Sequence, residues 1–173
     1  MTMWVFGYGS LLWNPGFEPA EAVTATLSGY HRSFCMLSIH HRGTVEEPGL
    51  VLALDEADST CVGVAFRVAQ PDEVRVLAEL RERELISSAY EEAHVPLSLK
   101  DGRDVDALAY VINRTHEQYC QFDLERQAQM IARSVGGRGP NPEYLFNTAN
   151  HLVEMGIDDP DMAWLVQRVR ELA

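Results

Sequence analysis

The stretch 3–13 constrains the fold most strongly, because an apolar run is interrupted by Gly-Tyr-Gly-Ser and then resumes without a polar interval. This pattern predicts a strand, a tight loop and a return into the core. Gly7 and Gly9 can adopt positive φ and carry no side chain, so successive amides there can converge on a ligand close to the main chain. Such amides bind an anion or oxyanion, and the alternative interpretation is a glycine-bearing strand end at a sheet corner.

Strand-like composition dominates the first 70 residues. Valine, threonine and aromatic residues gather in four segments, and the last two are expected to be joined by a hairpin-like turn over 55–60; the segments are 22–27, 30–39, 49–54 and 61–68. Two further strands are predicted at 94–99 and 106–113, with a glycine-containing turn between them.

Helical patterns follow. Pro71 suits a first helical position and Asp72 and Glu73 suit a first turn, so a helix is expected to begin there and to run to about Leu85. Further helices are predicted from Asp123, and after the Asn-Pro and Asp-Pro pairs, at 143–155 and 161–172. Strands, one helix, strands and then helices predict an α+β fold, a small mixed β-barrel with packed helices, in a single domain over 1–173.

The net charge of −12 argues against nucleic-acid and anionic-membrane partners, because both require a basic face. An anionic substrate would then need local positive character from backbone amides or from Arg32 and Arg42. The three cysteines form no CxxC pair, which favours a reducing compartment. No signal peptide or membrane-spanning segment is evident in the sequence, so a cytoplasmic protein is expected.

Glu84 is the carboxylate with the most unusual predicted position. At about 100° per residue, Val74, Leu77 and Leu80 share one stripe of the helix, and Glu84 falls within about 20° of it. Glu82 falls on the far side. A carboxylate on an apolar stripe is costly without a partner, so either the helix frays there, an arginine neutralises the charge, or the group performs chemistry.

Other candidate sites have simpler interpretations. His40 and His41 would point to opposite faces of a strand, which disfavours a metal site. Ser10 lacks the G-x-S-x-G elbow of an activated nucleophile and is interpreted as a hydrogen-bonding loop residue. Cys35 lies in an apolar run and is expected to be buried.

The segment 5–13 resembles the opening of the ChaC-type γ-glutamylcyclotransferases, whose hallmark is V-F-G-Y-G-S-L-[IL]-W. Further similar segments follow in the same order and cover nearly the whole chain: His41-Arg42-Gly43, Pro48-Gly49, Gly63–Arg67, Arg83-Glu84 with Tyr90, and Glu143–Phe146. Arg81-Glu82 offers a second Arg-Glu frame, but the spacing to Tyr90 and the stripe favour Glu84 as the family's catalytic glutamate.

The resemblance implies a γ-glutamylcyclotransferase-like fold and cleavage of glutathione into 5-oxoproline and cysteinylglycine, without cofactor or metal. It implies Glu84 as general acid–base and a substrate-binding set that comprises Val5, Phe6, Gly7, Tyr8, Gly9, Ser10, Leu11 and Tyr144. Alternatives are a cyclotransferase for other γ-glutamyl amino acids or amines, and a non-catalytic module that binds a small ligand. The expected partner is a small molecule, and monomer and dimer both stay open.

Overall fold

The computed structural model describes residues 2–85 and 88–173. The chain divides into two compact units, the first formed by Met1–Ser33 and Ala53–His116, the second by Phe34–Leu52 and Glu117–Ala173. The predicted single domain stays a prediction, which one cooperative unfolding transition would support.

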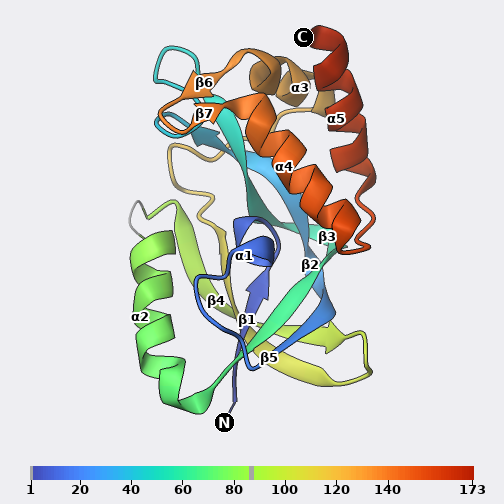
Figure 1. Cartoon of the computed structure of the whole chain (residues 1–173). Helices are drawn as coiled ribbons and strands as arrows, with labels where there is room; N and C mark the ends of the chain where they lie inside the picture. The colour runs from blue at the N-terminus through green and yellow to red at the C-terminus, as the bar shows by residue number, and fades with distance from the viewer. Residues whose placement is uncertain (1, 86–87) are drawn as a thin grey trace. The chain divides into compact units, whose positions relative to one another are not determined.

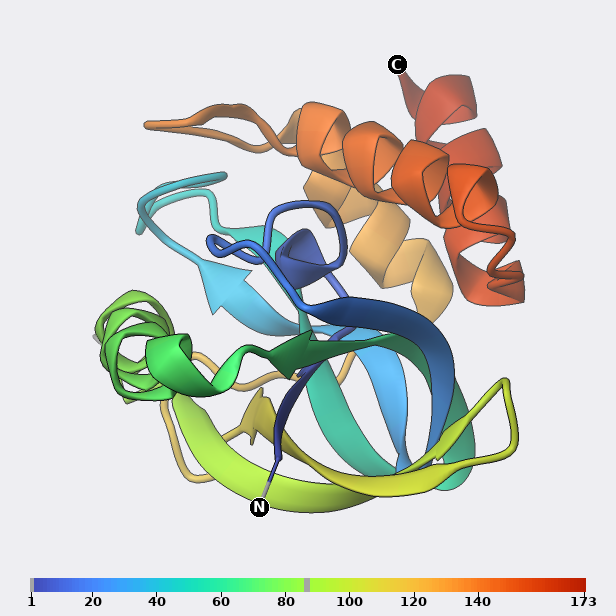
Figure 2. The same cartoon turned by 60° about the horizontal axis from the view of Figure 1, so that its bottom comes forward.

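Five strands form a closed barrel, and Figures 1 and 2 show their ribbons. Its strands are adjacent in the order β1-β3-β2-β4-β5, with bounds β1 Met3–Gly7, β2 Glu21–Ser38, β3 Gly49–Val68, β4 Tyr90–Leu99 and β5 Asp104–Ile112. β1 is antiparallel to β3 and parallel to β5, where Val5 is paired with Leu108. The predicted α+β barrel with packed helices is confirmed.

Two strand predictions were wrong in their boundaries. The segments 22–27 and 30–39 form one strand, β2, in which Gly29 has φ 89° and lets the strand bend without ending. The turn predicted at 55–60 is instead extended backbone within β3. Residues 56–60 are exposed, so their polar side chains reflect solvent contact rather than a break in the strand.

Helix α2, Glu73–Glu84, begins after a short 3-10 turn, η1, Gln70–Asp72, as the proline and acidic residues predicted. Val76 and Leu80 are buried in one cluster with Val5 and Leu108 of the barrel. Val74 is 85% exposed, so its predicted place on the inward stripe was wrong.

The second unit contains three packed helices, α3 Leu124–Arg133, α4 Asn141–Glu154 and α5 Pro160–Leu172, and a small hairpin of β6 Val135–Gly136 with β7 Gly139–Pro140. Asp159 caps α5 as predicted, since its side chain accepts a hydrogen bond from the Met162 amide. Asn141 is no cap. Its side chain instead pairs with both the N–H and the C=O of Leu50. Over residues 2–85 and 88–173, no helix has the length and apolarity needed to span a membrane.

Candidate active site

The Gly7–Leu11 loop runs from the last residue of β1 into the first two residues of α1, Ser10–Trp13, a helix of a single turn. Gly7, Tyr8, Gly9 and Leu11 are buried, and Ser10 is exposed. Because the Val5 and Leu11 side chains belong to the core cluster, these two residues can touch a ligand only through their main chain. The loop therefore offers backbone groups and the Ser10 hydroxyl, rather than an apolar wall.

The glycines serve the loop differently from the prediction. Gly9 has φ −131°, and the positive-φ glycines among the described residues do not include Gly7. A Cβ on Gly7 would lie 3.1 Å from backbone atoms of Leu11 and Leu12. Gly7 is thus needed because α1 packs on its own strand end, and left-handed backbone is not the reason for either glycine.

Arg32 holds this loop through hydrogen bonds to main-chain carbonyls. Its side chain is 5% exposed, and its Nε donates a 2.7 Å hydrogen bond to the Tyr8 carbonyl, while a terminal nitrogen donates to the Val62 carbonyl. The guanidinium thus ties the loop to β3. Arg32 brings the positive charge that the sequence led us to expect, together with a structural role.

Glu84 is the last residue of α2 and faces inward, as predicted, with 15% of its side chain exposed. It lies at four-residue spacing from Val76 and Leu80. Of the predicted stripe, Leu80 is in the core cluster and Leu77 packs against it, and only Val74 was placed wrongly. Burial raises the pKa of the Glu84 carboxyl, and the nearby Arg83 charge opposes that rise. Glu82 is exposed, in agreement with its predicted place on the far side.

Arg83 connects Glu84 to the loop. Its Nε lies 3.4 Å from Glu84 Oε1, its Nη1 donates to the Asn14 carbonyl at 2.8 Å, and its Nη2 donates to Ser10 Oγ at 3.1 Å. Glu84 and the Gly7–Leu11 loop, which the sequence nominated separately, are therefore brought together in the first unit.

Tyr110 of β5 lies beside this arrangement. Its hydroxyl donates a 3.1 Å hydrogen bond to Glu92 of β4. The pKa of Tyr110 is raised, first by burial and then by the negative charges of Glu92 and Glu84. The Tyr110 phenol and the largely buried Glu84 carboxyl are therefore close enough to interact electrostatically near the C-terminus of α2.

Tyr144 belongs to α4 in the second unit and is described by its contacts there. Its hydroxyl accepts a 3.2 Å hydrogen bond from the Leu52 amide, and its ring meets that of Phe34 edge to face. The Arg42 guanidinium lies 5.8 Å from the ring centroid and 3.6 Å from Glu143. The predicted role of Tyr144 in substrate binding stays a prediction.

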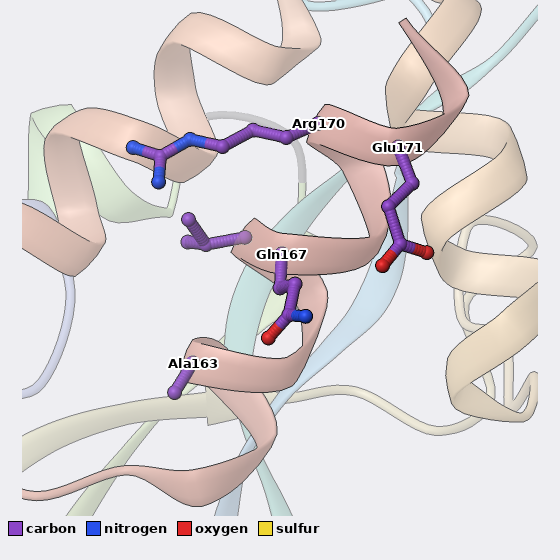
Figure 3. A pocket seen from close by; sticks show the side chains of 5 residues that line it. Ala163, Gln167, Arg170 and Glu171 are labelled. Atoms are coloured by element: carbon purple, nitrogen blue, oxygen red, sulfur yellow. The ribbon is translucent and has the colours of Figure 1, made fainter.

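A pocket on α5 is lined by residues of that helix alone. Figure 3 shows its side chains projecting from successive turns of that helix, and the lining consists of Ala163, Val166, Gln167, Arg170 and Glu171. No predicted site residue is among them. Within the part of the chain that the structure describes, no three His, Cys, Asp or Glu side chains are grouped as a metal site would require. Cys35 is buried, as predicted.

Comparison with known proteins agrees with the fold and with the motifs. The model of the ChaC-like protein family matches residues 3–172, and the chain belongs to this family. It is 38% identical to the glutathione-specific gamma-glutamylcyclotransferase of Escherichia coli (strain K12), over 98% of this chain and 74% of that protein. A human protein named glutathione-specific gamma-glutamylcyclotransferase 1 is 32% identical, over 97% of this chain and 78% of its own length.

Among solved structures, a yeast gamma-glutamyl cyclotransferase specific to glutathione superposes with a TM-score of 0.86. The match covers 98% of this chain and 96% of the yeast chain, at 23% identity, and so concerns the fold. The resemblance inferred from the sequence motifs is confirmed.

Sequence reasoning gave Arg83 no role of its own. Its position directly before Glu84 in the last turn of α2 was visible, but its partners Ser10 and Asn14 lie 73 and 69 residues earlier. Only the fold reveals that contact. The structural role of Arg32 was missed for a similar reason, since its acceptors Tyr8 and Val62 lie on other strands or loops.

Proposed function

We propose that this protein is a γ-glutamylcyclotransferase that degrades glutathione to 5-oxoproline and cysteinylglycine, with Glu84 as its general acid–base. The names of the relatives support the reaction and the substrate. The single structural observation behind the role of Glu84 is a largely buried carboxyl with a raised pKa, one guanidinium away from the Gly7–Leu11 loop.

The reaction needs one group that moves a proton twice. The Glu84 carboxylate takes a proton from the α-ammonium of the γ-glutamyl unit, and the freed amine attacks the γ-carbonyl carbon of the same unit. A five-membered ring forms, and the protonated Glu84 gives its proton to the departing nitrogen as the amide bond to cysteine breaks. The attacking nitrogen loses its second proton when the lactam forms, and that proton passes through the carboxylate or water to the departing amine, which ends as an ammonium. The substrate supplies the nucleophile. Burial suits Glu84 to this work, because it brings the pKa of the carboxyl closer to neutral pH.

The Gly7–Leu11 loop would hold the γ-glutamyl unit in its cyclising conformation. The donors for this role would be the main-chain N–H groups of the loop that precede Leu12, because the Leu12 amide already donates to the Gly9 carbonyl at 2.9 Å. Donors of this kind can stabilise the negative charge that develops on the γ-carbonyl oxygen. The Ser10 hydroxyl, already bonded to Arg83, is the polar side chain closest in sequence to these donors.

A cytoplasmic setting is proposed with this activity. All three cysteines are free and buried, which suits a reducing compartment in which glutathione is abundant as the thiol. The proposed partner is this small molecule, and the net charge of −12 disfavours a nucleic acid as a partner.

The test is separate incubation of the purified protein with glutathione and with γ-glutamyl-alanine, with chromatographic measurement of 5-oxoproline. We expect product from glutathione and little from γ-glutamyl-alanine. Product from γ-glutamyl-alanine alone would replace the proposed substrate with other γ-glutamyl amino acids. Binding of either compound without product would instead identify a non-catalytic module.

A further inference from the structure

We propose that Arg83 is a positioning residue that fixes the Glu84 carboxylate relative to helix α1 and its loop, an inference that rests on the proposed function. The three nitrogens of its guanidinium have three different partners: Glu84, the Asn14 carbonyl and the Ser10 hydroxyl. Two of these partners are the first residue and the C-cap of α1, and the third is the proposed general acid–base.

The two α1 contacts define that helix at both ends. Ser10 is its first residue and Asn14 is its C-cap. A single guanidinium therefore contacts the start and the end of one helical turn, at 3.1 Å and 2.8 Å. Because Ser10 and Leu11 belong both to the Gly7–Leu11 loop and to α1, fixing both ends of α1 also fixes the direction in which the loop amides point.

Only arginine can make this set of contacts. Its guanidinium is planar and carries five N–H donors in a fixed arrangement, whereas the lysine ammonium is a single point of charge. The side chain of Arg83 is 33% exposed, and an ordinary ion pair at such a place contributes little to stability. The expected effect of the residue is therefore on the geometry of the reaction more than on folding.

Two strands of the barrel, β4 and β5, carry further titratable groups in the neighbourhood of Glu84. Tyr110 of β5 lies close enough for the Glu84 charge to raise the pKa of the phenol, and it is hydrogen-bonded to Glu92 of β4. Tyr90, the first residue of β4, packs against the same core cluster. None of these three groups is a cation, so Arg83 is the group that opposes the burial effect on the Glu84 pKa.

Arg81, the other basic residue in the last turn of α2, has a different partner. It donates two hydrogen bonds to Glu92, at 3.0 Å and 2.9 Å, and these hold the pKa of Glu92 below its ordinary value. Its charge is thus directed to β4. Arg81 therefore pairs with Glu92, and Arg83 pairs with Glu84.

The experiment compares Arg83→Gln and Arg83→Lys with the parent in kcat, KM and the pH profile of kcat/KM for glutathione. For Arg83→Gln we expect kcat to fall about 10- to 100-fold, the loss typical of a reacting group displaced by about 1 Å. The acidic limb of the profile should move to higher pH, because the pKa of Glu84 rises further without the guanidinium. Arg83→Lys should keep the acidic limb but recover only part of kcat.

Arg75→Gln is the matched control, since Arg75 lies on the same helix and pairs with Asp72 and Glu79 there. It should retain the parent's kinetics. In a double-mutant cycle, Ser10→Ala and Arg83→Gln together should cost less than the product of their separate losses, because both remove the same contact. Arg83→Lys keeps the test decisive if Arg83→Gln folds poorly.

An active parent with an Arg83→Gln variant that keeps kcat and the acidic limb would overturn this inference alone, as would full recovery of kcat by Arg83→Lys. A parent that forms no 5-oxoproline from any γ-glutamyl compound would overturn the proposed function as well. The two failures are therefore distinguishable by the parent's own product assay.

Discussion

Glu84 in the first unit and Asn141 in the second are both polar residues of helices that face inward, but their surroundings differ. Asn141 is fully buried, and its amide pairs with the Leu50 N–H at 2.8 Å and the Leu50 C=O at 2.9 Å. Glu84 is 15% exposed and lies 3.4 Å from one arginine nitrogen, and burial still raises its pKa.

The contrast separates a polar group that builds the fold from one that is poised for chemistry. The Asn141 amide has both its donor and its acceptor paired with Leu50, so it fixes the position of that residue of β3 relative to α4. A carboxamide does not titrate, so it cannot act as an acid or a base. A carboxyl that is partly desolvated and only partly neutralised has a raised pKa and can both accept and return a proton. Four predictions test this difference, from the largest expected effect to the smallest.

Glu84→Gln should lower kcat for glutathione by about 10²–10⁴, the usual effect of losing a general acid–base group, with KM nearly unchanged. Steady-state kinetics with 5-oxoproline as the measured product provide the check. Glu82→Gln, an exposed carboxylate on the same helix, is the control and should be as active as the parent. An active Glu84→Gln together with an inactive Glu82→Gln would assign the catalytic role to the other Arg-Glu pair.

Asn141→Ala should lower the free energy of unfolding by about 2–4 kcal/mol, because it leaves both the N–H and the C=O of Leu50 unpaired in the interior. Urea denaturation followed by circular dichroism would measure this. Asn147→Ala, at an exposed position of the same helix, should change stability by less than about 0.5 kcal/mol. Equal stabilities for the two variants would contradict a structural role for Asn141.

Tyr144→Phe should raise KM for glutathione about two- to tenfold if the hydroxyl contributes one hydrogen bond to the substrate. The same change removes the acceptor of the Leu52 amide and should lower the free energy of unfolding by about 1 kcal/mol. Kinetics and denaturation on one preparation separate the two effects. Reduced stability with the parent's KM would make the hydroxyl purely structural.

The smallest effect concerns the pH dependence of stability. The pKa of Glu84 is raised on folding, so its contribution is largest at low pH and is lost as the pH rises through the folded-state pKa. The Glu84→Gln variant has no carboxyl at this position, so it does not lose stability in this way as the pH rises. The Tm of the variant minus that of the parent should therefore increase between about pH 4 and pH 7, by a few degrees at most. A difference that stays constant across this range would mean that Glu84 is not desolvated.

Much of the fold could be predicted from local patterns. The helix that begins after Gln70-Pro71 and the capping role of Asp159 follow from chemistry within a few residues. The continuity of β3 could not be predicted, because residues 56–60 are polar and exposed whether they form a turn or a solvent-facing part of a strand. The function of Asn141 was also hidden, since its partner Leu50 lies 91 residues earlier.

Part of the candidate site could also be predicted from the sequence. Helical periodicity was enough to predict that Glu84 faces inward, although Val74, predicted on the same stripe, is exposed. The conformation of Gly9 was not predictable, because glycine permits backbone angles on both sides of zero and the sequence does not select among them. The contacts of Arg83 join parts of the chain that only the closed barrel brings together.

Two strands, β2 and β3, each begin in one unit and end in the other, and the chain changes unit after Ser33, Leu52 and His116. Neither unit is therefore a continuous piece of sequence, and a single cut cannot release either of them whole. Gene fusion and recombination exchange continuous segments, so a single exchange cannot replace the unit that carries Glu84 and leave the unit that carries Tyr144 intact. Such a replacement would need two separate exchanges, one for Met1–Ser33 and one for Ala53–His116.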